Sequence, residues 1–449
     1  MSLSLAADAL HSRYHGRDVV FNGVSTDTRT LKQGDLFVAL TGPRFDGHLF
    51  LAEALGAGAA GAMVSRQIET TLPTIEVEDT RIALGSLASF WRAQFNIPLV
   101  AVTGSNGKTT VKNMIASIFG QSAPVCATQG NLNNDIGVPL TLLTLRKEHR
   151  HAVIEMGMNH RGEIAYLSNL AKPAVAVITN AAHAHLEGLG SVEQVAQAKG
   201  EIFSGLADTG IAVINADDPF SKLWRDLAAP RQVMTFGMEN PADVSAEYQP
   251  TDGGSLVSMK TTEGDIEMQL PLLGKHNVMN ALTAATASIA GGASLADIRN
   301  GLEKLQAVSG RLEIKKGING ARILDDTYNA NPDSVGAGLQ VLREANGERV
   351  LVLGDMAELG QASEEIHRRV GELARRVGVH RLFAVGPLSR HAASAFGKGG
   401  KHFASQEEAA DALLDVLHSD MTVLVKGSRS MHMERVVAGI TKSGKSKKK

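Results

Sequence analysis

The sequence predicts a three-domain α/β protein. We expect a small N-terminal α/β domain, a central doubly wound domain with a parallel sheet, and a C-terminal open α/β domain of Rossmann-like type. The chain has 449 residues, and at roughly 150 residues per domain this length suggests about three domains. Apolar strand patterns alternate with helical patterns along most of the chain, as in parallel sheets. Residues 231–273 instead show short alternating strands with turns such as TDGG and TEGD, which predicts an antiparallel excursion.

The first domain is expected at residues 1–85. Its predicted elements are a strand at 35–40 (DLFVAL), a helix at 51–60 and a strand at 61–65 (GAMVS). The hydrophobic patterns of these segments are typical of a small α/β unit. A further helix at 86–95 leads into the second domain.

The second and third domains are expected at residues 86–310 and 311–449. Buried strands alternate with helices in both, which implies open, mainly parallel sheets. Central strands are predicted at 98–103, 151–157, 174–180 and 210–216, with helices at 110–120, 192–206 and 275–290. Third-domain strands are predicted at 321–327, 347–355, 379–386 and 421–428. The basic, low-complexity tail at 442–449 is expected to be disordered.

Composition excludes several classes of function. The net charge is −2 and aromatic residues make up 4% of the chain, so we expect neither a basic nucleic-acid-binding face nor a base-stacking surface. The single cysteine, Cys126, excludes an internal disulfide and fits a reducing compartment. No apolar run reaches the roughly 18 residues of a membrane span. We therefore expect a soluble, cytoplasmic protein without membrane insertion, and a monomer by default.

The strongest local motif is TGSNGKTT at 103–110, between a predicted strand and a predicted helix. Glycines let the backbone wrap around an anion, while successive N–H groups and the helix N-terminus supply positive potential. Lys108 can reach the β- and γ-phosphates of a nucleotide, and the Thr109 hydroxyl can ligate Mg²⁺. Val102 stands where the usual motif has its first glycine. The alternative is a strand–helix turn that binds no ligand, which the GKT at the junction disfavours.

Further polar residues follow the next predicted strands. Glu155 lies at the end of the strand at 151–157, where a carboxylate can complete a Mg²⁺ site. His183 and His185 come just after the next strand. A loop histidine taken singly is more often an ordinary polar residue, but these two are expected beside the same crevice. Lys199 follows on a predicted helix, and the sequence by itself favours a solvated lysine there.

Motifs along the whole chain resemble those of the Mur ligases. They run in order and fall in all three predicted domains. The segments that carry the resemblance are TGSNGKTT, GNLNNDIGVPLTLL (130–143), EMGMNHRGEI (155–164), HLEGLGSVEQVAQAKGEIF (185–203), GKHNVMNAL (274–282), GRLE (310–313), DDTYNANP (325–332) and VLGDMAELG (352–360).

Within this family, four segments resemble the member that adds D-alanyl-D-alanine to UDP-N-acetylmuramoyl-tripeptide. They are NLNNDIGVPLTLL, TYNANPDS, GDMAELG and LVKGSRS. The member that adds diaminopimelate or lysine would be expected to carry a DNPR-type motif in the third domain, and this sequence has none. Folate polyglutamate ligases share the phosphate loop but lack the uridine-binding first domain.

The resemblance implies that the first domain holds the UDP moiety, the central domain binds ATP, and the third brings D-alanyl-D-alanine and closes over the site. It assigns nucleotide-sugar binding to Ser25, Asp27, Thr28, Arg29, Arg44, Asp46, Gly47 and His48, which alone would be interpreted as turn residues. It assigns ATP contacts to Gly104, Ser105, Asn106, Gly107, Lys108, Thr109, Thr110, Asn277, Arg311 and Asp326. Further substrate contacts would come from Asn134, Asn159, His160, Asn329, Asn331, Lys426 and Arg429.

The implied activity is ATP-dependent joining of a carboxylate to an amine through an acyl phosphate, giving a UDP-muramyl pentapeptide for peptidoglycan synthesis. The resemblance gives catalytic roles to Lys108, His185 and Lys199, and Mg²⁺ to Thr109, Glu155 and His185. Both chemical steps gather negative charge, so the site needs cations and preorganised donors. Lys199 matches a lysine that several members carry as a carbamate, and burial would lower its pKa and favour reaction with CO₂. Either meso-diaminopimelate or lysine fits as the third residue of the tripeptide.

Two other classes of protein share part of the pattern. A P-loop ATPase or switch protein would hydrolyse ATP without needing a carboxylate and an amine. A non-catalytic uridine-nucleotide-binding protein could retain the first domain, but it has no reason to keep Lys108, Thr109, Glu155 and His185 together. Dependence of phosphate release on two co-substrates distinguishes a ligase from both.

Overall fold

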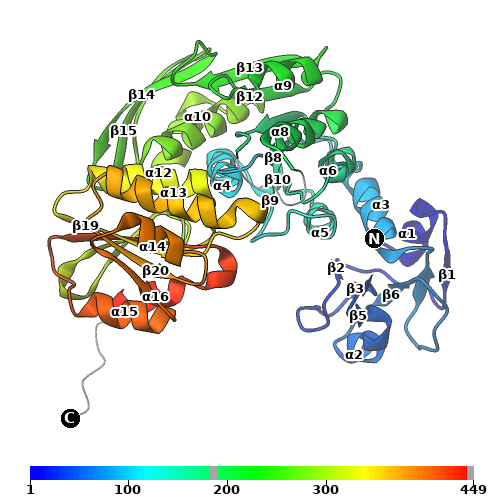
Figure 1. Cartoon of the computed structure of the whole chain (residues 1–449). Helices are drawn as coiled ribbons and strands as arrows, with labels where there is room; N and C mark the ends of the chain where they lie inside the picture. Colours follow the sequence, from blue (N-terminus) through cyan, green and yellow to red (C-terminus); the bar gives the residue numbers. More distant parts are fainter. Residues whose placement is uncertain (183–189, 442–449) are drawn as a thin grey trace.

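The structure is a computed structural model that describes residues 1–182 and 190–441. Within these ranges the chain forms three main sheets and one two-stranded hairpin. Figure 1 shows the N-terminal sheet (blue) and the C-terminal sheet (orange and red) below opposite ends of the central sheet (cyan and green). The predicted three-domain α/β class is confirmed.

The N-terminal sheet has the strand order β1-β7-β6-β3-β2. Its strands are β1 (Arg13–His15), β2 (Gly23–Ser25), β3 (Asp35–Val38), β6 (Gly61–Val64) and β7 (Thr74–Glu76). All pair in parallel except β1, which is antiparallel to β7. The other elements are α1 (Leu3–Ala9), the hairpin β4 (Thr41–Gly42) and β5 (Phe45–Asp46), the 3₁₀ helix η1 (Gly47–Phe50), and α2 (Leu51–Gly56). Because parallel strands end at one edge, the segments after β2, β3 and β6 lie together.

Helix α3 (Thr80–Arg92) joins the N-terminal sheet to the central one. It begins at Thr80, earlier than the predicted start, because the Asp79 side chain caps it by accepting two backbone N–H groups. Leu84 and Leu87 on this helix are fully buried in a core that also contains Leu142 of the central part. The N-terminal and central parts therefore share one apolar core.

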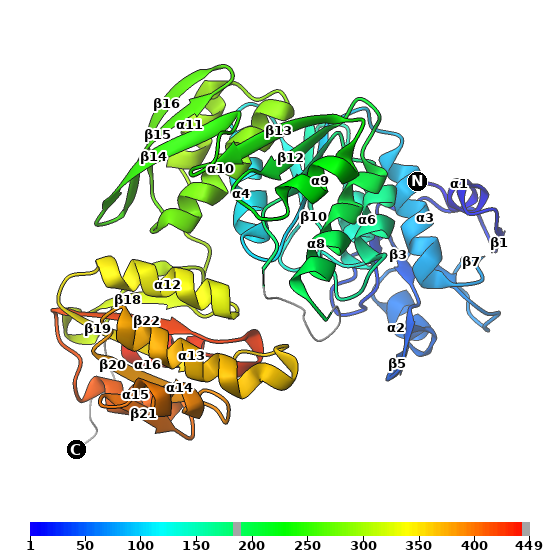
Figure 2. The same cartoon turned by 45° about the horizontal axis from the view of Figure 1, so that its top comes forward.

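The central sheet has the order β16-β15-β14-β13-β12-β11-β8-β10-β9. Its strands are β8 (Leu99–Thr103), β9 (Val125–Ala127), β10 (His151–Glu155), β11 (Val175–Ile178), β12 (Ile211–Asn215), β13 (Gln232–Gly237), β14 (Val244–Thr251), β15 (Gly254–Thr261) and β16 (Gly264–Leu270). Figure 2 shows β14, β15 and β16 as an extension remote from the N-terminal part. This extension is the predicted antiparallel excursion, but β13, inside the same predicted segment, is parallel to β12. Helix α9 (Ser221–Ala228) connects β12 to β13, and a crossover of this kind permits parallel pairing.

Helices cover both faces of the central sheet. In β8, Leu99 and Ala101 face one core while Val100 and Val102 face the other, and all four are fully buried. One face is covered by α5 (Gly137–Leu142), α6 (Glu163–Ala171), α8 (Val192–Gly200), the 3₁₀ helix η2 (Glu201–Gly205) and α9 (Ser221–Ala228). The other face is covered by α4 (Lys108–Phe119), α10 (Lys275–Ala290) and α11 (Leu295–Glu303).

The C-terminal sheet has the order β17-β18-β22-β19-β20-β21. Its strands are β17 (Glu313–Lys316), β18 (Arg322–Asp326), β19 (Glu348–Gly354), β20 (Arg381–Val385), β21 (Gly400–Phe403) and β22 (Met421–Lys426), all parallel except β17. One face carries α12 (Pro332–Glu344), α13 (Ser363–Arg376) and α14 (Arg390–Phe396); the other carries α15 (Gln406–Leu414) and α16 (Glu434–Thr441). Short 3₁₀ helices are η3 (Ile318–Gly320), η4 (Gly360–Ala362) and η5 (Arg429–Met431).

Across residues 1–182 and 190–441, no helix is both long and apolar enough to span a membrane.

A pair of helical glycines tests the close packing of α11 against α4. A Cβ at Gly301, in α11, would lie 2.5 Å from the Ile118 Cα of α4, so Gly301→Ala should destabilise the protein by about 1–3 kcal/mol. Gly336, in α12, has open space around a Cβ, so Gly336→Ala should stabilise by up to about 1 kcal/mol through helix propensity. Urea unfolding midpoints relative to wild type measure both. Equal shifts in the two variants would contradict the close helix contact.

Candidate functional site

The phosphate loop lies between the end of β8 and the start of α4. Gly104 and Gly107 have φ of 150° and 83°, a region that side chains rarely adopt. A Cβ at Gly104 would lie 1.8 Å from Thr179 Oγ1, and a Cβ at Gly107 would lie 2.3 Å from Asn280 Oδ1. The loop is therefore packed against β11 and α10, and both positions require glycine.

Lys108 turns back over this loop from the first position of α4. Its Nζ donates to the Gly104 carbonyl at 2.6 Å and to the Ser105 carbonyl at 3.3 Å. Burial lowers the pKa of Lys108, the Glu155 carboxylate raises it, and the Arg311 guanidinium lowers it again. The Lys108 ammonium thus lies at the mouth of an N–H-rich turn, where a polyphosphate would supply the missing negative charge.

Glu155, at the end of β10, is 2% exposed. Its Oε1 accepts from Asn133 Nδ2 at 2.8 Å, and its backbone N–H donates to Thr128 Oγ1 at 2.9 Å. Its Oε2 is buried and has no hydrogen-bond partner among the described residues, which is costly for a carboxylate unless a cation binds it. The predicted position of Glu155 on the ligand-bearing edge agrees with this geometry.

Thr109, at the start of α4, is the second predicted oxygen donor for a metal. Its Oγ1 accepts from Arg311 Nη2 at 3.0 Å. In the part of the chain that the structure describes, no group of three His, Cys, Asp or Glu side chains could hold a metal ion. A hydroxyl and one carboxylate nevertheless fit Mg²⁺, which typically takes one or two protein oxygens together with phosphate and water.

Lys199, on α8, is 1% exposed and is one of the largest fully buried side chains among the described residues. The solvated position that the sequence by itself favoured is therefore wrong. Burial, with a smaller contribution from the Lys108 charge, lowers the pKa of Lys199 well below its ordinary value. The available signal was helical spacing, because Val195, Ala196, Ile202 and Phe203 lie three or four residues from Lys199 and are all buried. His183 and His185 lie outside the described residues.

Lys112 is a buried lysine that the sequence analysis missed. It is 5% exposed, and its Nζ donates to the Thr128 carbonyl at 2.7 Å. Since the Thr128 hydroxyl accepts the backbone N–H of Glu155, Lys112 braces the strand end that carries the carboxylate. Burial lowers the pKa of Lys112, and Glu155 opposes this effect. The sequence signal for Lys112 was its position one helical turn after Lys108, which places both lysines on the same face of α4.

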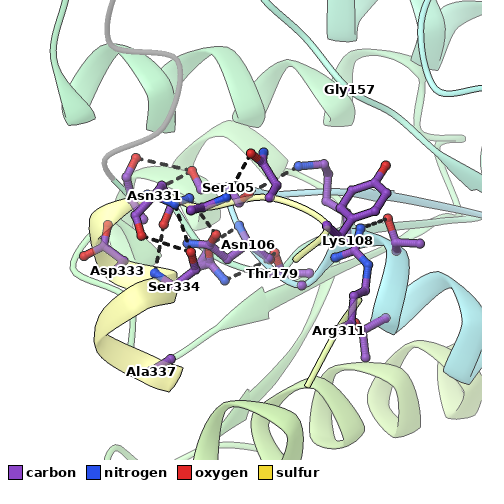
Figure 3. Close-up of a pocket in the computed structure, with 18 of the residues that line it drawn as sticks. Ser105, Asn106, Lys108, Gly157, Thr179, Arg311, Asn331, Asp333, Ser334 and Ala337 are labelled. Atoms are coloured by element: carbon purple, nitrogen blue, oxygen red, sulfur yellow. Dashed lines mark hydrogen bonds between the residues drawn. The ribbon is translucent and has the colours of Figure 1, made fainter. Parts of the chain in front are cut away.

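The C-terminal part reaches across to the phosphate loop (Figure 3). Arg311 stacks over the Tyr328 ring at 4.2 Å and donates to Thr109. Asn331 caps α12, accepting from Ser334 N at 2.8 Å, while its Nδ2 donates to Asn106 Oδ1 at 2.8 Å. The two parts enclose a cleft of about 870 Å³, lined from both sides. This volume is of the size that holds a small ligand such as a nucleotide.

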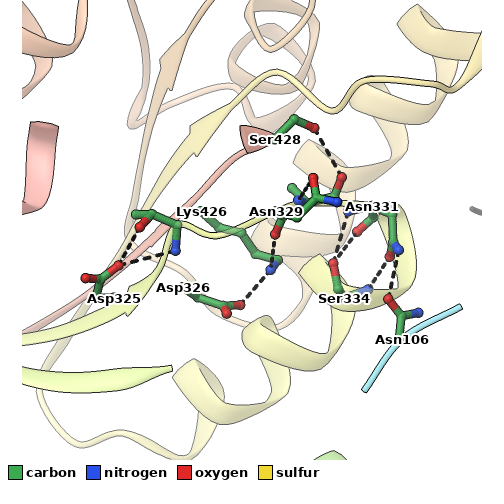
Figure 4. A network of polar contacts seen from close by, with 10 residues as sticks. Asn106, Asp325, Asp326, Asn329, Asn331, Ser334, Lys426 and Ser428 are labelled. Atoms are coloured by element: carbon green, nitrogen blue, oxygen red, sulfur yellow. Dashed lines mark hydrogen bonds and ion pairs between the residues drawn. The ribbon is translucent and has the colours of Figure 1, made fainter. Parts of the chain in front are cut away.

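Several predicted residues line this cleft but are already engaged within the protein. Lys426 is 2% exposed, and its Nζ contacts Asp326 Oδ2 at 2.7 Å and the Asn329 carbonyl at 2.8 Å (Figure 4). Burial raises the pKa of Asp326, and Lys426 opposes that rise. Arg429 also lines the cleft, with a 62% exposed side chain that pairs with Glu434 at 3.1 Å. Of these two cations, Arg429 is the one accessible to an incoming carboxylate.

Three of the predicted asparagines line the cleft from the central part. Asn277 lines it and accepts from Asn280 Nδ2 at 3.1 Å, and Asn134 caps α5 by accepting from the Gly137 N–H at 2.8 Å. Asn159 also lines the cleft, and the backbone N–H groups of Asn159 and His160 donate to Glu163.

The eight predicted nucleotide-sugar residues lie apart from this cleft, at the shared edge of the N-terminal strands. The side chain and backbone N–H of Arg29 form four hydrogen bonds with the Asp27 carboxylate, which lowers the pKa of that carboxyl to about 2. The side chain of His48 contacts Asp46 at 2.6 Å. The Arg66 guanidinium, which the sequence analysis missed, binds Asp46 Oδ2 at 2.5 Å and, as the larger cause, lowers the pKa of Asp46.

The rest of this set makes local contacts. The Ser25 hydroxyl donates to the Asp27 carbonyl, and the Thr28 hydroxyl donates to Glu53. A Cβ at Gly47 would lie 2.7 Å from the Leu40 carbonyl oxygen. Arg44 is exposed to solvent.

Family models match most of the chain. The model described as Mur ligase family, catalytic domain, matches residues 20–92. The Mur ligase middle domain matches 102–288, and the Mur ligase, glutamate ligase domain matches 310–429. The chain is also 45% identical over 448 residues to UDP-N-acetylmuramoyl-tripeptide–D-alanyl-D-alanine ligase of Escherichia coli strain K12, with 99% of each chain covered.

Solved structures give the same relationship. A crystal structure of MurF from Acinetobacter baumannii has a TM-score of 0.92 and 37% identity, covering 98% of each chain. MurF ligase from Thermotoga maritima in complex with ADP has a TM-score of 0.82 and 28% identity, covering 93% of this chain and 96% of that one. This fold, with its phosphate loop facing a second α/β unit, is that of an ATP-dependent, ADP-forming ligase of amide bonds. The chain belongs to the Mur ligase family.

The phosphate-loop lysine gives a direct test of the site. Lys108→Ala should lower turnover by at least about 10²-fold, the scale for removing one preorganised charge from a developing anion. The fold should survive, because Lys108 Nζ contacts the loop rather than a core. Lys222→Ala, at a side chain that is 87% exposed, is the matched control and should retain activity. Near-normal turnover in folded Lys108→Ala would contradict the assignment.

Proposed function

We propose that this chain joins D-alanyl-D-alanine to UDP-N-acetylmuramoyl-tripeptide with consumption of ATP, giving a UDP-muramyl pentapeptide for peptidoglycan synthesis. The observation that carries the proposal is the cleft of about 870 Å³, which brings the phosphate loop together with the third-domain motifs. Whole-chain similarity to ligases named for these two substrates supports it.

A carboxylate does not react readily with an amine because its oxygen is a poor leaving group, so the carboxylate must first be activated. Transfer of the γ-phosphoryl group of ATP to the tripeptide carboxylate gives an acyl phosphate and ADP. The dipeptide amine then attacks the carbonyl carbon, the amide bond forms, and inorganic phosphate leaves with the former carboxylate oxygen. Phosphoryl transfer of this kind depends mainly on positioning and charge compensation.

The residues of the cleft would supply the positive charge that compensates the phosphates. We assign Lys108 to the β- and γ-phosphates and Arg311 to a phosphate or ribose contact from the opposite wall. Asn277, Asp326, and the loop residues from Gly104 to Thr110 would complete the ATP site. Mg²⁺ held by Thr109, Glu155 and His185 would supply further positive charge beside the phosphates. Lys112 and Asn133 keep Glu155 in place through the contacts described above.

The other two domains would provide the substrates. The segments after β2 and β3, from Ser25 to Arg29 and from Arg44 to His48, would hold the UDP moiety, and the remaining predicted contacts would lie along the cleft. We propose domain bounds of 1–85, 86–310 and 311–449, with the third domain closing to exclude water from the acyl phosphate. A cytoplasmic monomer fits the nucleotide substrates and the single reduced thiol of Cys126.

Phosphate release tests the two-substrate requirement. ATP with UDP-N-acetylmuramoyl-tripeptide should give little phosphate until D-alanyl-D-alanine is added, because its amine resolves the acyl phosphate. ADP, phosphate and pentapeptide should then form in equal amounts, measured by coupled assay and chromatography. Equal use of a free amino acid such as glutamate or diaminopimelate would instead place the chain with another member of the family, and phosphate release with neither co-substrate would indicate an ATPase.

Lys199 supplies a second test. We propose that its neutral amine reacts with CO₂ and loses a proton, giving a carbamate anion, since burial holds its pKa low. Lys199→Ala should be nearly inactive and partly rescued by acetate, which can replace the missing anion. Wild-type enzyme in ¹³C-bicarbonate should show a carbamate signal by NMR that Lys199→Ala lacks. A folded Lys199→Ala without rescue, together with no carbamate signal in wild type, would contradict the proposal.

A further inference from the structure

Tyr328 lies in the DDTYNANP segment, between residues with predicted ligand contacts, and no role was predicted for it. Its side chain is 36% exposed and lines the cleft. The backbone N–H of Tyr328 donates to the Gly310 carbonyl at 3.0 Å, which holds the segment before β17 beside the end of β18. This contact places the Tyr328 ring against Arg311, with the Arg311 Cζ 4.2 Å from the ring centroid.

Arg311 differs from Lys426, another cation of the cleft, in how its charge is held. Lys426 forms an ion pair with Asp326 at 2.7 Å. Within residues 1–182 and 190–441, Arg311 has no carboxylate at ion-pair distance; its Nη2 donates to Thr109 Oγ1 at 3.0 Å, and its buried Nε has no hydrogen-bond partner. The Thr109 hydroxyl therefore fixes one end of the guanidinium, and the Tyr328 ring supports its face.

An aromatic ring suits this position better than a carboxylate would. A carboxylate would neutralise Arg311 and repel an incoming phosphate, whereas the face of a ring attracts a guanidinium without carrying a net charge. Arg311 also acts on Lys108 and Lys112, whose pKa values it lowers. Repulsion among these cations would turn Arg311 away from the phosphate loop before a nucleotide binds, and the contact with the ring opposes that movement.

From this geometry we propose that Tyr328 is a positioning residue for ATP: its ring holds the Arg311 guanidinium toward the phosphate loop, so that the charge is in place before the nucleotide arrives. Orienting a charged group in advance reduces the cost of binding. The inference rests on the proposed function, in which Arg311 contacts the nucleotide, and it adds the residue that orients Arg311.

The test is binding of a non-hydrolysable ATP analogue with Mg²⁺ to the full-length enzyme, measured by calorimetry. Tyr328→Leu keeps an apolar side chain but removes the ring, so the Kd should rise about three- to thirtyfold, the range of one cation–π contact. Tyr328→Phe keeps the ring and should bind within about twofold of wild type. Tyr14→Leu, at a tyrosine of β1 that is 39% exposed, is the matched control and should leave the Kd unchanged.

A double-mutant cycle separates this role from direct stacking of Tyr328 on the base. Arg311→Ala should raise the Kd at least as much as Tyr328→Leu does. Adding Tyr328→Leu to Arg311→Ala should then change the Kd by less than about twofold, because the ring acts through Arg311. An equal effect of Tyr328→Leu in both backgrounds would show that the ring contacts the nucleotide itself, and would overturn the inference.

Fluorination of the ring is a second measurement that does not depend on the folding of Tyr328→Leu. Phenylalanine derivatives with increasing numbers of ring fluorines, incorporated at position 328, weaken the negative potential of the ring face with little change in shape. The Kd should rise along this series when Arg311 is present and stay constant with Arg311→Ala. A Kd that stays constant in both backgrounds would also overturn the inference.

The outcomes distinguish this inference from the proposal on which it rests. If Arg311→Ala weakens binding of the analogue and Tyr328→Leu does not, this inference alone fails. If Arg311→Ala leaves the Kd unchanged, the assignment of Arg311 to the nucleotide fails and the inference fails with it. Binding is measured without the dipeptide, so a wild type that binds the analogue but forms no amide with D-alanyl-D-alanine would contradict the proposed substrates and leave this inference standing.

Discussion

An excess of positive charge at the end of β8 is the constraint on which the site depends. Lys108 and Lys112 are held there with lowered pKa values, and Arg311 adds a third cation from across the cleft. Glu155 is the buried carboxylate that opposes both of these lysines. Buried cations without full compensation are costly. A polyphosphate in the cleft removes that cost, so ligand affinity and local stability come from the same charges.

Several residues at the cleft both stabilise the fold and form the candidate functional site. Asn331 caps α12 with its side-chain oxygen and contacts the phosphate loop with its side-chain nitrogen. The glycines of the loop are fixed by packing against β11 and α10 as well as by the ligand they would surround. Because Asn106 belongs to the loop, a ligand bound there also acts on the contact of Asn106 with Asn331 of the C-terminal part.

Local patterns were enough to predict the longer buried strands, the phosphate loop and the position of Glu155, but short strands such as β1, β2 and β9 were missed. The burial of Lys199 was missed because a lysine is usually solvated, although its neighbours at helical spacing, such as Val195 and Ile202, are apolar. The contacts Arg311–Thr109 and Asn331–Asn106 join residues 202 and 225 positions apart. The parallel pairing of β13 was missed because strand patterns show length and exposure but not direction. The pairing of Lys426 with Asp326 was missed because both residues had been assigned separate ligands.

The distribution of charge between the parts also explains how the cleft can open and close. Lys426 and Asp326 form their ion pair within the C-terminal part, so the pair moves with that part and no buried charge is separated. In the part of the chain that the structure describes, Arg311 and Asn331 each form a single hydrogen bond across the cleft. Each is worth only about 1 kcal/mol, since water replaces it when broken. These two contacts across the cleft are therefore weaker than the buried ion pair within the C-terminal part, as the proposed closure of the third domain requires.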